Sequence, residues 1–212
     1  MPNLPISQLP ASSTLTGAEL FVLVQNGVTK QVTLNSLLTS LTSNYGLFNQ
    51  TGSSTPVTNT TTETTLLDGG VGTLSVPANN FEVGDAFHVT LTGHISSQNN
   101  DTLQIRIKSN GATLADTGAI SMSGVSDKHW KMEVYFTINA VGAAGVASIA
   151  TGGNFQYTQD AAGTSKNINF STENNTTFDT TVNNTLVITA QWSNARVANS
   201  IYSNICTLVK TY

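Results

Sequence analysis

Residues 72–96 read GTLSVPANNFEVGDAFHVTLTGHIS, and this stretch decides the fold class of the chain. Its last part alternates between polar residues and one apolar set, Phe87, Val89, Leu91, Gly93 and Ile95. Successive side chains of a β-strand point to opposite faces, so this alternation predicts a strand with one buried and one solvated face. The tripeptide Val83-Gly84-Asp85, which precedes it, is typical of a turn that leads into the strand.

The same alternation recurs through the rest of residues 57–212. Apolar residues occupy every second position in three further runs: Leu103, Ile105 and Ile107; Trp130, Met132, Val134, Phe136 and Ile138; and Leu186, Ile188, Ala190 and Trp192. The glycine pair Gly152-Gly153 suggests a bulge in another strand. For residues 158–184 the pattern leaves both strands and an ordered loop open.

These runs predict roughly eight to ten strands with no helical pattern between them, so the strands must pair mainly antiparallel. We therefore predict an all-β protein whose main domain, residues 57–212, is an antiparallel β-sandwich. A jelly roll is the natural architecture for this number of strands, and another Greek-key sandwich is the alternative.

The first part of the chain follows a different pattern. An apolar run from Leu20 to Val24 and a second strand-like run over 28–33 flank Asn26-Gly27, a strong signal for a two-residue hairpin turn. Leucines at helical spacing follow, with Thr33 or Asn35 as the cap. We expect residues 1–45 to form a β-hairpin and a short helix. Residues 46–56 are rich in Ser, Gly, Asn and Pro, and we expect them to form a linker.

This N-terminal segment is too small to be stable by itself. We expect it to dock into another protein or to trimerise, and packing against the main domain is the alternative. The apolar residues that would carry this anchoring contact are Leu9, Leu20, Phe21, Val22, Val24, Val32, Leu34, Leu37 and Leu41.

The chain carries few charges. Charged residues make up 9% of the sequence, against about a quarter in a typical protein. The net charge is −4 and no basic cluster occurs, which disfavours binding to nucleic acid or to an anionic membrane. No apolar run is long enough to span a membrane and the N-terminus lacks the layout of a signal peptide, so we expect synthesis in a cytoplasm. The single cysteine, Cys206, cannot form an internal disulfide, and we expect it to be buried or half-buried.

No set of residues in the sequence predicts catalysis. There is no Gly-x-Ser-x-Gly nucleophile elbow and no phosphate-binding loop. His88 and His94 share a strand face but are separated by about 20 Å at ~3.3 Å per residue, too far to chelate one metal ion. One His from each of three subunits could still meet on a threefold axis. We therefore expect no enzymatic activity, no cofactor and no metal site within one chain.

Tyr135 is the candidate for a contact between subunits. It lies on the polar face of its strand, because the apolar positions of that strand are the even-numbered ones. An outward aromatic residue on a charge-poor sandwich indicates an intersubunit contact, and an isolated exposed tyrosine is the alternative.

Two segments resemble known protein families. Residues 6–38 are similar to the N-terminal segment of many bacteriophage tail-fibre and virion-decoration proteins, through Ile6, Leu9, Pro10, Gly17, Glu19, Gly27, Lys30, Val32, Thr33 and Leu34. Residues 74–96 resemble the opening strands of tumour-necrosis-factor-like jelly rolls on virions, through Leu74, Val76, Pro77, Ala78, Gly84 and Asp85.

These resemblances imply a tumour-necrosis-factor-like jelly roll in residues 57–212 and a structural role in a virion. The protein would be a short homotrimeric spike or fibre, or a capsid or tail decoration, anchored by its N-terminus. Its partners would be copies of itself, other capsid or tail proteins, and a host-surface glycan or protein. The alternatives are a carbohydrate-binding module or lectin without a viral anchor and, in a third class, a surface-acting hydrolase.

Overall fold

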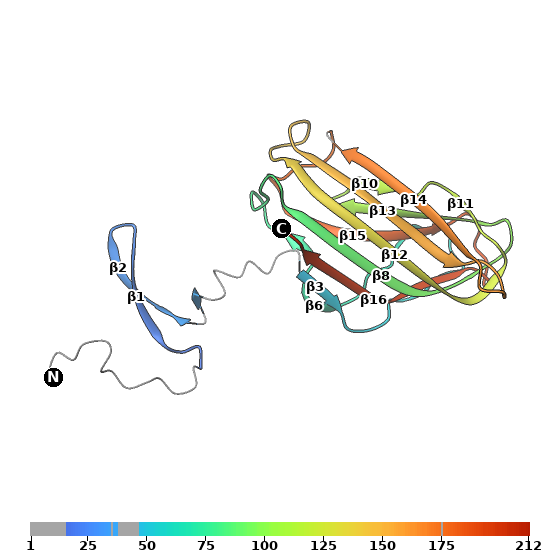
Figure 1. Cartoon of the computed structure of the whole chain (residues 1–212), viewed down its shortest axis with the longest axis horizontal. Helices are drawn as coiled ribbons and strands as arrows, with labels where there is room; N and C mark the ends of the chain where they lie inside the picture. Colours follow the sequence, from blue (N-terminus) through green and yellow to red (C-terminus); the bar gives the residue numbers. More distant parts are fainter. Residues whose placement is uncertain (1–15, 35, 38–46, 175) are drawn as a thin grey trace. The chain divides into compact units, whose positions relative to one another are not determined.

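The structure is a computed structural model, and it describes residues 16–34, 36–37, 47–174 and 176–212 (Figure 1). Its contacts divide the chain into two units, residues 1–44 and residues 45–212. The elements that position the candidate functional residues are strands in both units.

The described part of the first unit forms the expected hairpin and the start of a helical turn. Strand β1 (Leu20–Gln25) pairs antiparallel with β2 (Val28–Thr33). Asn26 and Gly27 both have positive φ, 53° and 75°, as a type I′ turn requires. The helical turn begins at Leu34, and Thr33 Oγ1 caps it by accepting a hydrogen bond from the backbone N–H of Ser36 at 3.1 Å.

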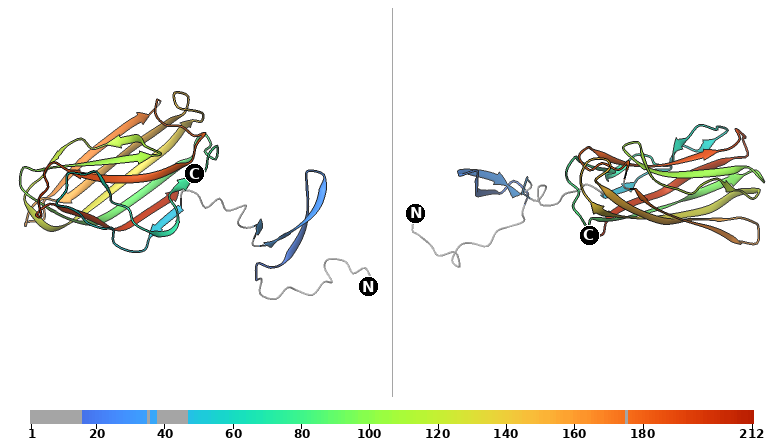
Figure 2. Two further views of the ribbon diagram at one scale, coloured as in Figure 1. Left: turned by 180° about the vertical axis from the view of Figure 1, so that it is seen from behind. Right: turned by 90° about the horizontal axis from the view of Figure 1, so that it is seen from above.

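The second unit contains two antiparallel sheets (Figures 1 and 2). The strands of the larger sheet are β3 (Leu47–Gln50), β4 (Val57–Thr58), β6 (Gly70–Thr73), β8 (Ala86–Ser97), β12 (Val125–Ala140), β13 (Ser148–Thr158), β14 (Ser165–Asn174) and β16 (Ser200–Lys210). The strands of the smaller sheet are β5 (Thr64–Thr65), β7 (Ser75–Val76), β9 (Thr102–Ser109), β10 (Ala112–Asp116), β11 (Ile120–Ser121) and β15 (Asn184–Trp192).

The order of strands confirms the predicted antiparallel β-sandwich. The large sheet runs β14-β13-β12-β8-β16-β3-β6, with β4 paired to β16. The small sheet runs β10-β9-β15-β5, with β11 paired to β9 and β7 paired to β15. From β8 onward the chain changes sheets four times, at β8–β9, β11–β12, β14–β15 and β15–β16, so it crosses between layers rather than completing one sheet first.

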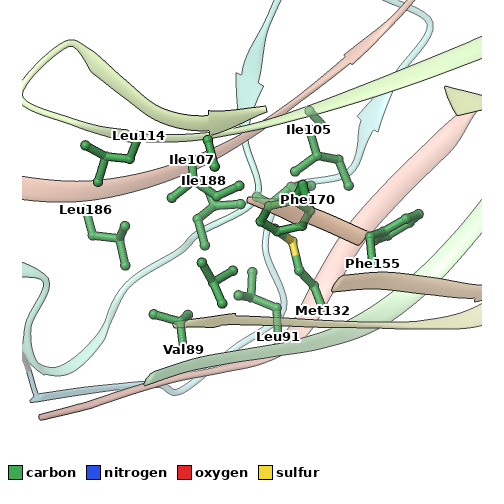
Figure 3. Packing of buried hydrophobic residues seen from close by; sticks show 14 of the residues in the cluster. Val89, Leu91, Ile105, Ile107, Leu114, Met132, Phe155, Phe170, Leu186 and Ile188 are labelled. Atoms are coloured by element: carbon green, nitrogen blue, oxygen red, sulfur yellow. The ribbon is translucent and has the colours of Figure 1, made fainter. Parts of the chain in front are cut away.

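Residues 86–96, the alternating part of the stretch 72–96, lie in β8, between β12 and β16. Its predicted apolar face is buried over the whole strand, and Leu91 is fully inaccessible. Across the core, Ile105 and Ile107 of β9 and Ile188 of β15 face it from the small sheet (Figure 3). Fully burying a side chain of this size stabilises the fold by about 1.5–3 kcal/mol. The two sheets are therefore held together by the buried apolar side chains that the alternation in the sequence places on their inner faces.

Residues 47–50 correct the predicted linker 46–56. They form β3, which pairs with β16 on one side and with β6 on the other. Phe48 packs into the core at 7% exposure, and Gln50 Nε2 donates a hydrogen bond to Ser203 Oγ at 3.0 Å. This short strand forms because it pairs with strands that lie far from it in the sequence. Its local composition, which is like that of a linker, gives no sign of those partners.

The glycine pair Gly152-Gly153 of β13 makes no bulge, so the bulge predicted there from the sequence is wrong. The register with β12 and with β14 continues through Gly152 and Gly153 without a shift. A Cβ on Gly153 would lie against the carbonyl oxygen of Glu133 and 2.8 Å from Cζ of Phe170. The glycine is needed because the Phe170 ring covers the backbone at this point.

The region 158–184, left open by its sequence, contains both strand and loop. Strand β14 pairs with β13 along its whole length. Between β14 and β15, Phe178 is buried at 1% exposure. The loop is therefore held to the sandwich by an apolar side chain.

Candidate functional site

The face of the large sheet that points away from the core, here called the outer face, carries Tyr135. Tyr135 on β12 is paired directly with His88 on β8. Their rings stack with centroids 4.4 Å apart and planes 2° from parallel, while Tyr135 stays 52% exposed. The structure thus confirms the outward position that the alternation predicts. The stack holds a flat aromatic surface open to solvent.

Exposed apolar side chains continue across this face from Tyr135. On β16, Val209 pairs with His88, and Ile205 is 50% exposed beside a register shift of that strand. On the next strand along the sheet, Leu47 is also exposed. We call Tyr135, His88, Val209, Ile205 and Leu47 the Tyr135 patch. Exposed apolar groups that gather on one face are typical of interaction surfaces.

The other end of β8 on the outer face carries a second aromatic group. His94 pairs directly with His129 of β12 and with Tyr202 of β16. The rings of His94 and Tyr202 stack at 5.8 Å, and His129 meets His94 edge-on at 6.4 Å. Nδ1 of His94 lies 2.8 Å from Oδ1 of Asp127. This pairing joins histidines of two different strands, so it depends on the register between them and is not visible in the spacing of histidines along one strand.

A network of charges lies on the outward side of the small sheet. Arg106 on β9 contacts Glu63 at 3.1 Å and Asp116 at 3.3 Å, and Lys108 also pairs with Glu63. Thr189 on β15 donates a hydrogen bond to Glu63 at 2.6 Å. Partial burial works against ionisation of Glu63, but the hydrogen bonds from Lys108 and Thr189 and the nearby cations lower its pKa overall. The network joins β9, β10, β15 and the segment before β5. Its role is therefore to hold these parts of the fold together.

Asp101 organises loops at one end of the sandwich. Its carboxylate accepts hydrogen bonds from Asn199 at 2.8 Å and Asn194 at 2.7 Å, and Arg196 lies 3.1 Å away. The hydrogen bond from Asn199 is the main reason why the pKa of Asp101 is lowered. Each donor comes from the segment between β15 and β16, so this carboxylate also serves the fold.

The hairpin of the first unit exposes apolar side chains on both of its faces. Leu20, Val22 and Val24 lie on one face and are 62%, 77% and 70% exposed. Phe21, on the opposite face, is 44% exposed, and Val32 is paired with it. The residues of β2 across from Val22 and Val24 are Gln31 and Thr29. Both are polar, so β2 gives these two valines no apolar cover.

The predicted anchoring residues fall into three groups. Leu20, Phe21, Val22 and Val24 are exposed on β1. Val32 on β2, together with Leu34 and Leu37 in the helical turn, is half-buried. Leu9 and Leu41 lie outside the described residues.

Sites for chemistry are scarce in the part of the chain that the structure describes. Within it, no three or more His, Cys, Asp and Glu side chains gather so as to hold a metal ion. Burial raises the pKa of the Cys206 thiol to about 12, so this cysteine is unreactive, and its predicted burial is confirmed. A cavity of about 50 Å³ between the sheets is lined mainly by apolar side chains such as Phe81 and Phe136. None of the helical residues described forms a segment of the length and apolarity needed to cross a membrane.

Comparison of the chain with protein-family models, with curated proteins and with solved structures finds no match. Support for a function therefore comes from the exposed surfaces of the two units and from the resemblances of the two sequence segments.

Proposed function

We propose that this protein is a structural component of a virion, attached to the particle through its N-terminal hairpin unit. In this proposal the sandwich is a jelly roll of the tumour-necrosis-factor-like type. It projects from the particle as a short homotrimeric spike or decoration. The observation that carries the proposal is the uncovered apolar surface of the hairpin.

An isolated two-stranded hairpin is at best marginally stable in water. Here β1 carries five consecutive apolar residues, and Val22 and Val24 are more than two-thirds exposed. An apolar strand that is left uncovered in this way is suited to a partner that covers it. Attachment to a larger assembly supplies such a partner and gives the small unit its missing stability.

The residues that carry the resemblance to phage anchoring segments also shape this unit. Glu19 accepts hydrogen bonds from the backbone N–H groups of Thr16 at 2.7 Å and Gly17 at 2.8 Å. These bonds lower the pKa of Glu19 to about 2, and the bond from the backbone of Thr16 has the largest effect. Gly27 completes the hairpin turn and Thr33 caps the helical turn. The residues that this segment shares with phage anchoring segments are thus residues that form its turn, its cap and its local hydrogen bonds. This supports the resemblance.

The Tyr135 patch supports the homotrimer. Tyrosine is enriched in protein interfaces, where charged residues are depleted. The patch is formed by a stacked Tyr–His pair and aliphatic side chains on a sheet face that is otherwise rich in threonine and asparagine. Association through this face would cover its exposed apolar side chains with those of neighbouring copies.

Multi-angle light scattering tests the proposal. The full chain should have three times the 22.3 kDa mass of one chain. Tyr135→Glu, which places a charge in the patch, should reduce the mass toward that of a monomer. Val197→Glu is the matched control, since Val197 is 81% exposed between β15 and β16. A monomeric full chain would overturn the homotrimer.

The attachment is tested separately with a chain that lacks residues 1–44. This truncation should keep a folded sandwich, measured by circular dichroism, and should no longer co-sediment with virus particles. Truncated chains that still bind particles would contradict the anchoring role.

A second candidate function, recognition of a glycan, is favoured by a polar hollow on the outer face. This hollow has a volume of about 210 Å³, and Gln156, Thr158 and Ser165 line it beside His129 and Lys131. Amide and hydroxyl groups of this kind form the hydrogen bonds that sugar hydroxyls require. A glycan array tests this function, with Gln156→Ala as the variant expected to lose any signal.

A further inference from the structure

His94 and His129 face each other on neighbouring strands of the outer face. They are a directly opposed pair in the register of β8 and β12, and their ring planes are 85° apart. Directly opposed residues of an antiparallel pair have their Cβ atoms about 4.5–5.5 Å apart. This spacing differs from that of His88 and His94, which lie on one strand and are separated by about 20 Å at ~3.3 Å per residue.

Asp127 fixes the orientation of the His94 ring. A carboxylate only accepts hydrogen bonds, so the proton in the 2.8 Å contact must be on Nδ1 of His94. The neutral ring therefore presents the lone pair of Nε2. A histidine held in this way by a carboxylate is the usual arrangement behind a metal ligand, because it sets the tautomer and raises the basicity of the coordinating nitrogen.

A β-bulge places Asp127 at this point. The register between β8 and β12 shifts between Val125 and Lys128, and Asp127 has a φ of 47°. Its backbone N–H donates to Ser96 Oγ at 2.9 Å. Bulges re-aim side chains, and residues in the left-handed region are concentrated at functional sites. The bulge turns the Asp127 carboxylate onto His94, so a locally unfavourable backbone conformation supports the pair.

The distance between the rings suits a shared ion. Two imidazole nitrogens each about 2.0–2.1 Å from one tetrahedral ion bring the ring centroids to about 5 Å. Reaching this value from the observed 6.4 Å requires a rotation of the His129 side chain, which is exposed. The hollow of about 210 Å³ lies on the other side of His129, toward β13 and β14, and His94 is not among its lining residues, so the ion would sit on the open sheet face between the two rings. Lys131, the nearest cation on this strand face, is paired with Glu133 at 2.8 Å.

We propose that His94 and His129 form a two-histidine site for a divalent transition-metal ion such as Zn²⁺ or Cu²⁺, with Asp127 as the positioning residue. Water completes the coordination, since only two protein ligands converge. The ion bridges β8 and β12, so it binds the folded chain and stabilises this strand pair. The inference is independent of the proposed virion role.

Isothermal titration of the full chain, stripped with chelator, with ZnCl₂ and CuCl₂ at pH 7.5 tests this site. We expect one ion per chain, with Cu²⁺ bound more tightly than Zn²⁺. His129→Gln should weaken binding at least tenfold, and Asp127→Asn by roughly 10-fold or more through loss of the carboxylate. His88→Gln is the matched control, because His88 lies on the same face of β8, and this variant should bind as the wild type does.

NMR of the imidazole groups supplies a second readout. Zn²⁺ should shift the resonances of His94 and His129 and leave those of His88 unchanged. Absence of saturable binding below millimolar ion concentration would overturn the proposal. Equal loss of affinity in His88→Gln, or unchanged affinity in a folded His129→Gln, would place the ion elsewhere and overturn it as well.

Discussion

Strands β1 and β8 are both rich in apolar residues, yet they have opposite surroundings. In β8 the apolar residues alternate with polar ones, and Leu91 is fully buried between two sheets. In β1 five apolar residues follow one another, and Leu20 is 62% exposed. Alternation lets one layer of a sandwich cover all apolar side chains, whereas an unbroken run needs cover on both faces. The two strands of the hairpin therefore leave apolar side chains uncovered, whereas the sandwich buries those of β8.

The largest effect should come from the same substitution made in both strands. Leu91→Ala should lower the free energy of unfolding by about 2–5 kcal/mol, because it opens a cavity in the core. Leu20→Ala should change it by no more than about 0.5 kcal/mol, since an exposed side chain loses little on truncation. Urea unfolding followed by tryptophan fluorescence measures the stability of the sandwich in both variants, because Trp130 and Trp192 are buried there, while Leu20 belongs to the other unit. Similar losses in the two variants would contradict the contrast between the strands.

A smaller effect is expected from the adjacent glycines of β13. Gly153→Ala should destabilise the sandwich by about 1–3 kcal/mol through overpacking against the backbone carbonyl of Glu133 and the ring of Phe170. Gly152→Ala should be neutral or stabilise the strand by up to about 1 kcal/mol, because the nearest atom to its Cβ is the Phe170 carbonyl oxygen at 4.0 Å. Thermal unfolding of the two variants provides the measurement. A destabilised Gly152→Ala would show that β13 is constrained on its outer face also.

The sequence predicts strands with a long apolar alternation well, and short or mostly polar strands poorly. In β8 and β12 the apolar side chains face one layer of core, so a period of two appears over many residues. Strand β3 has four residues and forms because β16 and β6 offer it partners far along the chain. The linker-like composition of residues 46–56 carries no sign of those partners.

The candidate site shows the same limit. The outward position of Tyr135 follows from alternation within one strand and is visible in the sequence. The pairing of His94 with His129 follows from the register of two strands, and the position of Asp127 from a bulge that shifts this register. A one-residue slip would move either histidine to the core face. Contacts of this kind depend on tertiary structure, so residue types and local spacing do not reveal them.

Acid should weaken the sandwich through Glu63. Its pKa in the folded chain is lowered from 4.5, so the folded state favours the ionised carboxylate more than the unfolded state does. This contribution to stability is fully present above pH 4.5 and is lost as the pH falls through the lowered folded pKa. In Glu63→Gln the urea midpoint should depend less on pH between about 5 and 2 than in the wild type. An unchanged pH profile would show that other carboxylates dominate acid unfolding.

The smallest effect on folding should accompany a loss of attachment. Val22→Ser combined with Val24→Ser makes one face of the hairpin polar, and both side chains are largely exposed. The free energy of unfolding of the sandwich should therefore change by no more than about 0.5 kcal/mol, and the mass in light scattering should stay that of the wild type. Co-sedimentation with virus particles should nevertheless be lost, because the apolar face that a partner would cover is gone. Thr29→Ser, on the strand residue paired with Val24, is the matched control and should attach normally. If the double variant still attaches, the uncovered face of β1 is not the anchor, and the contrast between β1 and β8 reflects local composition alone.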